Sequence, residues 1–251
     1  MSEDENKTNA VYSNFNSEKQ YRFLGIITAL YITFQLVSDI TAGKIVTLWL
    51  FPVSVTVLYF PVTYIFSDIL TEVYGYARAR TVLWTVLLCS VLAGLLYQLV
   101  VYLPPAEGFT ANDAFTRVLG QVPRILLGGW IAVFAGDIVN NYVLAKIKIW
   151  MNGKYLWVRT ISSTFVGQFV NTLLFYIIAL YGILPNTLLL QSIITGWILK
   201  VLVEIIFTPV TYYVVGKLKH LENEDYYDRD TDFNPFIIKP PQRIAGSRTR
   251  V

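Results

Sequence analysis

Two carboxylates inside one apolar stretch are the residues of this sequence best placed to do chemistry. Asp68 and Glu72 lie four residues apart within residues 60–80, so a helix presents both on one face. A carboxylate at the depth of the hydrocarbon costs about 2.5 to 3.5 kcal/mol on insertion scales. We therefore expect these two groups to have a ligand or a protein partner.

Three further apolar stretches carry polar side chains at helical spacing. These polar stripes are Asp137, Asn140 and Asn141 in residues 120–149, Thr164, Gln168 and Asn171 in residues 157–182, and Lys200, Glu204 and Thr208 in residues 187–218. Each stripe falls on one face of its helix. Four helices therefore offer hydrogen-bonding or charged groups that could face one another.

Each stripe also has a simpler structural interpretation, which the sequence leaves open. Lys200 and Glu204 would form an ion pair within one helix that lets both enter the bilayer. Glu72 would join Arg78 and Arg80 in a charge cluster at the end of its helix. The asparagines would hold helices together by hydrogen bonds worth about 0.6 to 2 kcal/mol each: Asn140, Asn141 and Asn171.

The composition indicates a membrane protein and argues against several kinds of enzyme. Of the 251 residues, 55% are hydrophobic and 15% charged, whereas a soluble domain carries about 25% charge. The single cysteine, Cys89, excludes an intrachain disulfide and a cysteine metal cluster. The single histidine, His220, leaves no Ser-His-Asp set or zinc helix, and the sequence has no Walker loop. We expect no enzyme activity, no cofactor and no metal site.

Six apolar stretches are long enough to cross about 30 Å of hydrocarbon, which takes about 20 residues. They are residues 22–39, 53–72, 80–103, 120–149, 157–182 and 187–218. The sequence therefore predicts an all-α integral membrane protein with six transmembrane helices in residues 21–220. Residues 44–52, apolar but too short to span, are expected to be a re-entrant or interfacial piece. Residues 1–20 are expected to be a polar tail, and residues 221–251 a disordered tail because of their dense charge.

Lysine and arginine are distributed unevenly among the connections. Ten lie on one side of the predicted bundle and three on the other, so the positive-inside rule places both termini in the cytoplasm. At about 1.5 Å per residue, Asp68, Asp137 and Gln168 fall between the midplane and the cytoplasmic side, and Glu204 falls near the middle. We expect these four side chains to meet in one cavity.

Three blocks of the sequence match a known pattern. The first is FPVTYIFSDILTEVYGYARAR at residues 60–80, the second is WVRTISSTFVGQFVNT at residues 157–172, and the third covers residues 200–212. Together they resemble the queuosine precursor transporter family, also described as a vitamin uptake transporter family. The resemblance covers residues 20–220.

The resemblance implies six transmembrane helices, similar to the substrate-binding subunits of energy-coupling-factor importers, in the cytoplasmic (inner) membrane of a prokaryote. It also implies a cargo, a 7-deazaguanine base taken up for tRNA modification. Binding positions of the family match Asp68, Glu72, Arg159, Gln168 and Asn171. Two residues depart from the family pattern, because Asn171 stands where Asp is common and Asp137 stands where Gln is expected.

The chemistry of such a base agrees with the polar stripes. A guanine-like edge carries N1–H beside an exocyclic amine, and one carboxylate accepts both. The carbonyl oxygen needs a donor, which an amide side chain supplies, and the flat ring can stack on an aromatic side chain for about 1 to 3 kcal/mol. We assign substrate binding to Asp68, Glu72, Asp137, Asn140, Arg159, Gln168, Asn171 and Glu204.

The sequence thus predicts an importer of queuosine precursors whose partners are the deazapurine base and the lipid bilayer, with no nucleic acid. It leaves open whether the chain forms a homo-oligomer and whether it has an energising partner. One alternative is a substrate-capturing subunit that needs a separate energising complex. A membrane enzyme or an assembly protein is a weaker alternative, because the sequence lacks a nucleophile–base set and a metal cluster.

Overall fold

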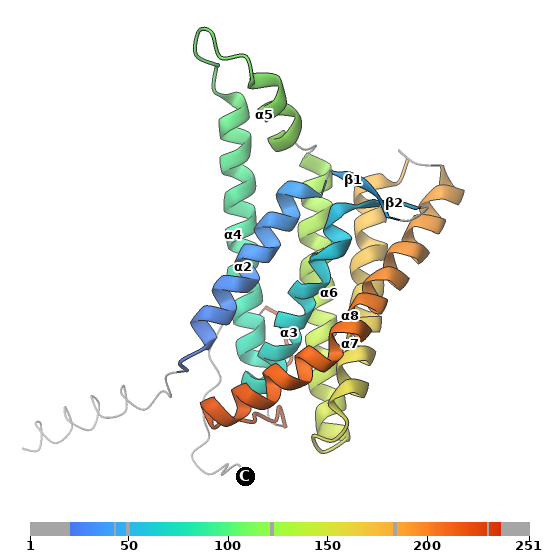
Figure 1. Ribbon diagram of the computed structural model, residues 1–251. Coiled ribbons are helices and arrows are strands. Elements are labelled where there is room, and N and C mark those ends of the chain that lie inside the picture. The colour runs from blue at the N-terminus through green and yellow to red at the C-terminus, as the bar shows by residue number, and fades with distance from the viewer. Residues whose placement is uncertain are drawn as a thin grey trace, which may run out of the picture.

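Helices that run alternately in opposite directions build the structure, a computed structural model that describes residues 21–42, 44–48, 51–120, 123–182, 185–229 and 231–236 (Figure 1). The π-helical turn η2 (Tyr176–Leu180) directly follows the helix Leu156–Phe175. The α-helices in the described part are α2 (Leu24–Thr41), α3 (Phe60–Tyr74), α4 (Tyr76–Tyr102), α5 (Asn112–Leu119), α6 (Pro123–Trp150), α7 (Leu156–Phe175) and α8 (Asn186–Glu222).

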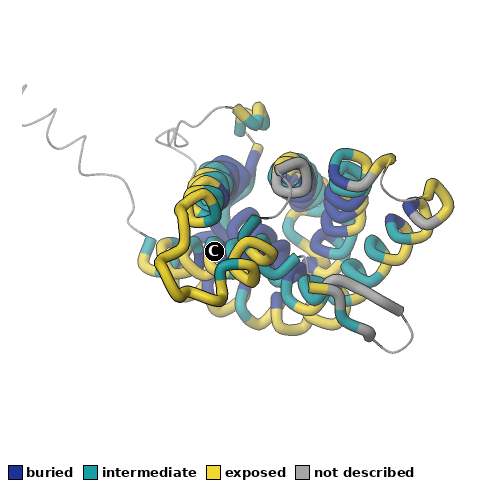
Figure 2. The backbone as a smooth tube through the Cα atoms, turned by 90° about the horizontal axis from the view of Figure 1, so that it is seen from above, coloured by how far each residue is buried: buried dark blue, intermediate teal, exposed yellow. Residues whose placement is uncertain are grey.

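The outer surface of the bundle is apolar. Seen along the bundle, buried residues lie on inward faces and exposed residues on outward ones (Figure 2). Among the described residues, α2, α4, α6, α7 and α8 are long and apolar enough to cross a membrane. An apolar surface of this extent is typical of contact with lipid, which confirms an all-α membrane protein. The exposed large residues of α4 show the pattern: Leu88, Leu92, Leu95, Leu96 and Leu99.

The second predicted span differs from a continuous transmembrane helix. α3 has 15 residues, which is about 22 Å of helix and less than the thickness of the hydrocarbon. It follows the 3-10 turn η1 (Val55–Leu58) and an antiparallel hairpin of β1 (Ile45–Leu48) and β2 (Phe51–Ser54). Within residues 44–52, which we predicted to be a re-entrant or interfacial piece, the described residues 45–48 and 51–52 lie in this hairpin. A sixth crossing through α3 stays a prediction.

Both ends of α3 are determined by single residues. Pro61 lies in the first turn, where its missing N–H would have no intrahelical partner anyway. Gly75 ends the helix with φ at +88°, and a Cβ on it would lie 2.2 Å from the Tyr226 ring, so this position needs glycine. The short link brings the end of α3 beside the start of α4. We call this end of the bundle the charged end and the opposite one, with β1 and β2, the hairpin end.

Part of the segment predicted to be disordered, residues 221–251, is folded against the charged end. Asp228 caps α4, because both of its carboxylate oxygens accept from the backbone N–H of Tyr76, at 3.1 and 3.0 Å. The Tyr76 hydroxyl donates to the Phe233 carbonyl, and the Trp84 indole donates to the Pro235 carbonyl at 2.9 Å. The prediction of disorder was wrong for residues 223–229 and 231–236, which we call the C-terminal segment.

α6 and α7 pack closely at two glycines. A Cβ on Gly136 would lie 2.4 Å from the Tyr64 hydroxyl and 2.7 Å from the Asn171 Cβ. A Cβ on Gly167 would lie 2.7 Å from the Asn140 Cβ. Small residues let transmembrane helices approach in this way. The close approach brings the polar residues of α6 and α7 to the same place.

We expect Gly136→Ala to destabilise the protein by about 1 to 3 kcal/mol, the usual cost of overpacking, because three neighbouring atoms must move. Gly129→Ala on the same helix is the matched control, since only the Phe175 ring comes within 4.0 Å of its added Cβ. Thermal unfolding in detergent measures both. Equal unfolding temperatures for the two variants would contradict the close contact.

Candidate functional site

The interior of the bundle holds a set of fully buried polar side chains, which we call the buried polar layer. Asn140 of α6 donates to Asp68 Oδ1 of α3 at 2.6 Å. α7 packs against both helices at this level, because the Tyr64 hydroxyl donates to the Gly167 carbonyl and a Cβ on Gly167 would lie 2.7 Å from the Asn140 Cβ. We use the name for six side chains of α3, α6, α7 and α8 that are 0% exposed and carry polar atoms without a partner in the described ranges: Asp68, Asp137, Asn140, Thr164, Gln168 and Glu204.

Most polar atoms of this layer have no hydrogen-bond partner among the described residues. They are Asp68 Oδ2, both oxygens of Asp137, Asn140 Oδ1, Thr164 Oγ1, both amide atoms of Gln168 and both oxygens of Glu204. An unsatisfied buried group costs about 1 to 3 kcal/mol, so a native structure keeps such groups for a reason. The acceptors outnumber the donors, which suits a ligand rich in N–H groups.

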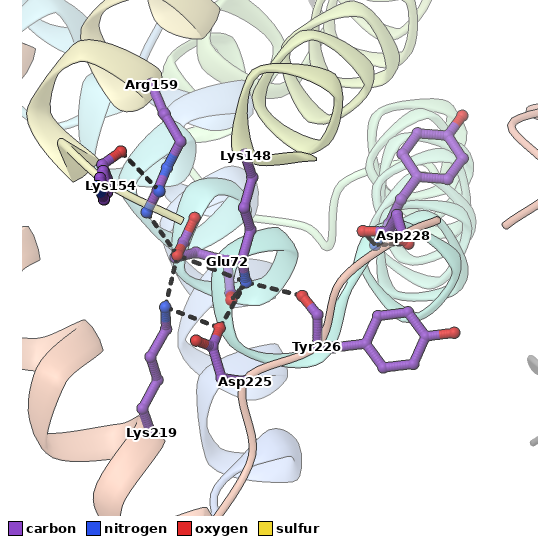
Figure 3. A network of polar contacts seen from close by, with 9 residues as sticks. Glu72, Lys148, Lys154, Arg159, Lys219, Asp225, Tyr226 and Asp228 are labelled. Atoms are coloured by element: carbon purple, nitrogen blue, oxygen red, sulfur yellow. Dashed lines mark hydrogen bonds and ion pairs between the residues drawn. The ribbon is translucent and has the colours of Figure 1, made fainter. Parts of the chain in front are cut away.

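Glu72 lies one turn beyond Asp68 but belongs to a different set of contacts (Figure 3). Its Oε1 accepts from Arg159 of α7 at 2.7 Å and from Lys219 of α8 at 2.6 Å. Lys148 of α6 lies 3.5 Å from the same oxygen and donates to the Glu72 carbonyl at 2.6 Å. Glu72, Lys148 and Arg159 are all buried. We use the name Glu72 network for the five residues Glu72, Lys148, Arg159, Lys219 and Asp225.

Asp225 of the C-terminal segment completes this network. Its Oδ1 accepts from Lys148 at 2.7 Å and lies 2.9 Å from the Lys219 ammonium, while the Tyr226 carbonyl also accepts from Lys148. Burial disfavours the ionised carboxylate, but Lys148 and Lys219 outweigh it and lower the Asp225 pKa. The carboxylate is therefore ionised at neutral pH, and the network joins α3, α6, α7, α8 and the C-terminal segment at the charged end.

The prediction that Glu72 forms a charge cluster with Arg78 and Arg80 was wrong about these two partners. Arg78 donates to the Tyr74 carbonyl at 2.9 Å and lies over the Tyr21 ring, and Arg80 donates to the carbonyls of Asp232 and Asn234. A charge cluster at the end of α3 does exist, as the structural interpretation of Glu72 expected. Its cations come from α6, α7 and α8, so Glu72 and Arg159 contact each other and lie at the end of the bundle.

A cavity of about 110 Å³ lies on the other side of the buried polar layer, toward the hairpin end. Of the eight residues that we predicted to bind substrate, only Asn171 is among the described residues that line this cavity. The described residues that line it also include Gln35, Ser38 and Asp39 of α2, Thr56 of η1, Phe60 of α3, Trp130 and Val133 of α6, Phe175 of α7 and Lys200 of α8.

Lys200 and Asn171 stand between this cavity and the buried polar layer. The Lys200 ammonium donates to Asn171 Oδ1 at 2.9 Å and to Thr172 Oγ1 at 3.3 Å. Both residues lie about one turn closer to the hairpin end than Glu204 and Gln168 of the layer. Because neither oxygen of Glu204 has a partner in the described part of the chain, the expected ion pair of Lys200 with Glu204 is not formed.

Asparagine hydrogen bonds between helices are present, as one interpretation of the stripes expected. Asn141 of α6 accepts from the hydroxyls of Ser67 and Thr71 of α3, each at 2.8 Å. Asn141 therefore joins two helices.

Sequence reasoning missed the contribution of α2. Gln35 and Asp39 are four residues apart in an apolar span, the same signal that identified Asp68 and Glu72. Their side chains are hydrogen-bonded to each other at 2.9 Å and line the cavity.

No group of three His, Cys, Asp or Glu side chains in the described ranges is arranged so that it could hold a metal ion.

Apolar helices that enclose buried polar side chains and a cavity are typical of multi-pass membrane proteins that bind a solute. Residues 54–214 match the model of the family described as "Putative vitamin uptake transporter". The chain belongs to this family.

Two relatives carry more specific names. The "Probable queuosine precursor transporter" of Bacillus subtilis (strain 168) is 30% identical over 147 residues, which are 58% of this chain and 64% of the relative. The "Queuosine precursor transporter" of Escherichia coli (strain K12) is 23% identical over 160 residues, 62% of this chain and 69% of the relative. The match thus spans just under two thirds of the first relative's length. No solved structure matches the chain.

The family is described as one of vitamin uptake transporters. Five of the described helices are long and apolar enough to cross a membrane, which agrees with membership of such a family.

We expect Glu72→Gln to destabilise the folded protein by about 3 to 5 kcal/mol, the cost of breaking a buried ion pair, because three cations would lose their shared carboxylate. The control is Glu107→Gln, whose side chain is exposed. Chemical or thermal unfolding in detergent measures the difference. If both variants unfold like the wild type, the Glu72 network does not hold the charged end together.

Proposed function

We propose that the protein is a membrane importer of queuosine precursors, which are 7-deazaguanine bases. The observation that carries the proposal is the buried polar layer, whose unpartnered atoms come from four helices of a transporter. The names of the two relatives supply the term queuosine precursor, and the family resemblance of the sequence implies a 7-deazaguanine base. Uptake of such a base would serve tRNA modification.

The unpartnered atoms of the layer complement the edge of a 7-deazaguanine. Asp68 Oδ1 accepts from Asn140, and Oδ2 has no partner among the described residues, so one carboxylate oxygen is available to the N1–H or the exocyclic amine. Asp137 and Glu204 offer further acceptors for an amine. The Gln168 amide can donate to the ring carbonyl, and Asn171, at the border of the layer, orients the base.

The charge distribution supports an orientation. The cations Lys148, Lys154 and Lys219 lie at the charged end, whereas Lys44 directly precedes β1 at the hairpin end (Figures 1 and 3). The positive-inside rule then makes the charged end cytoplasmic, in the inner membrane of a prokaryote with both termini in the cytoplasm. In this orientation the cavity lies on the outer side of the layer, and the Glu72 network lies on the inner side.

We expect Asp68→Asn to lower uptake of a radiolabelled 7-deazaguanine into liposomes roughly 10- to 150-fold, since a hydrogen bond to a charged group is worth about 1.5 to 3 kcal/mol. The variant keeps the shape of the side chain, so its thermal unfolding should change little. Asp113→Asn, at an exposed position in α5, is the control. Unchanged uptake by Asp68→Asn would remove Asp68 from the binding site.

The same liposomes test a second candidate function. The sequence has no nucleotide-binding Walker loop, which is also what a substrate-capturing subunit of a larger importer would show. A capture subunit should bind the base but not transport it without its energising complex. Binding without uptake by the purified wild type would favour that alternative.

Single cysteines test the orientation. In a Cys89→Ser background, we expect Lys44→Cys to react with an impermeant maleimide in intact cells and Lys154→Cys to react only after the membrane is opened. The reason is that the two positions lie at opposite ends of the bundle. The reverse labelling pattern would contradict the proposed direction of the helices.

A further inference from the structure

The cavity at the hairpin end has one wall that accepts hydrogen bonds. Gln35 of α2 is 2% exposed, and its Nε2 donates to Asp39 Oδ1 at 2.9 Å. Ser90 of α4 donates to the other oxygen of Asp39. Because Asp39 takes the amide N–H of Gln35, the amide oxygen is directed elsewhere, and Gln35 Oε1 has no partner in the described part of the chain. This oxygen is a buried acceptor on a residue that lines the cavity.

Lys200 of α8 and Asn171 of α7 supply hydrogen-bond donors at another wall of the cavity. Two of the three N–H groups of Lys200 are used by Asn171 Oδ1 and Thr172 Oγ1, which leaves the ammonium with one more donor. Since Asn171 Oδ1 accepts from Lys200, the Asn171 amide can offer its N–H₂ group to a ligand. Both residues line the same cavity as Gln35.

Aromatic and apolar side chains surround these polar groups. The Lys200 ammonium lies 4.8 Å from the centre of the Phe60 ring, which helps to hold it in place. Trp130 and Phe175 also line the cavity, so flat surfaces are available for stacking. A volume of about 110 Å³ is well below the roughly 300 to 1,000 Å³ of sites for drug-sized ligands. The ligand must therefore be small.

We propose that this cavity is a first binding site for a small, flat lactam heterocycle, distinct from the buried polar layer. The ring carbonyl accepts from Lys200 and Asn171, and a ring N–H or amine donates to Gln35 Oε1. Asp39 acts as a positioning residue that fixes the Gln35 amide. The inference rests on the proposed function, because it makes this cavity the place where the imported base binds before it reaches the layer around Asp68.

Two variants separate the two sites. We expect Asp68→Asn to lose uptake into liposomes and the binding of 7-deazaguanine at the layer, while binding at the cavity, measured in detergent, persists as one site per chain. Gln35→Leu, in contrast, should weaken binding at the cavity roughly tenfold, the effect of losing one hydrogen bond to the ligand, and should lower uptake as well. Thr33→Ala is the control on α2, because its exposed hydroxyl donates to the Ala29 carbonyl. The ligand control is 7-deazaadenine, which lacks the lactam and should bind weakly.

A protection experiment covers the case in which Gln35→Leu does not fold. Ala42 lines the cavity, so in a Cys89→Ser, Asp68→Asn background we expect 7-deazaguanine to protect Ala42→Cys from a small thiol reagent. No protection, or loss of all binding in Asp68→Asn together with unchanged binding in Gln35→Leu, would overturn the first site and leave the layer as the binding place. If the wild type neither binds nor transports 7-deazaguanine, both the proposed function and this inference fail.

Discussion

The carboxylate of Glu72 is the point at which α3, α6, α7 and α8 are tied together. Arg159 and Lys219 donate to one of its oxygens, and Lys148 lies 3.5 Å away. Removing either the carboxylate or the cations would lower the free energy of unfolding by about 3 to 5 kcal/mol, because the charges that remain would be buried without a partner. Fixing four helices at one end also fixes the height of residues farther along them, such as Asp68, one turn above Glu72. The position of the buried polar layer therefore depends on a contact outside it.

Polar side chains within the bundle fall into two groups that differ in how fully they are paired. At the charged end, Lys148 has three acceptors within 2.7 Å. In the layer, Asp137 and Glu204 have no partner among the described residues. Paired groups hold a structure in one arrangement, whereas unpaired buried groups are sites where a ligand gains the most by binding. The contrast in pairing locates the candidate site, because burial alone does not: Glu72, Lys148 and Arg159 of the network are also buried.

The sequence was sufficient to predict the five long helices and the polar stripes that form the layer, because long apolar stretches indicate membrane helices and helical spacing assigns their polar residues to one face. The bond between Asn140 and Asp68 confirms that the predicted stripes of α6 and α3 meet. Other features depend on contacts that composition does not contain. Residues 223–229 and 231–236 have the charge density of a disordered chain. In the structure, however, Asp225 forms ion pairs with Lys148 and Lys219, and Asp228 accepts from the backbone N–H of Tyr76 at the start of α4. The hairpin before α3 could not be predicted either, because a short apolar run does not distinguish a strand from a helix.

The separation along the chain between Glu72 and its cations has a consequence for when the Glu72 network can form during synthesis. Arg159 follows Glu72 by 87 residues and Lys219 by 147, so α3 is synthesised long before its carboxylate can be paired. The partners of Glu72 are made in the order Lys148 on α6, Arg159 on α7 and Lys219 on α8. Asp225, which contacts Lys148 and Lys219, comes after all of them. The Glu72 network is therefore complete only when the last of the long helices and the segment that follows it have been made.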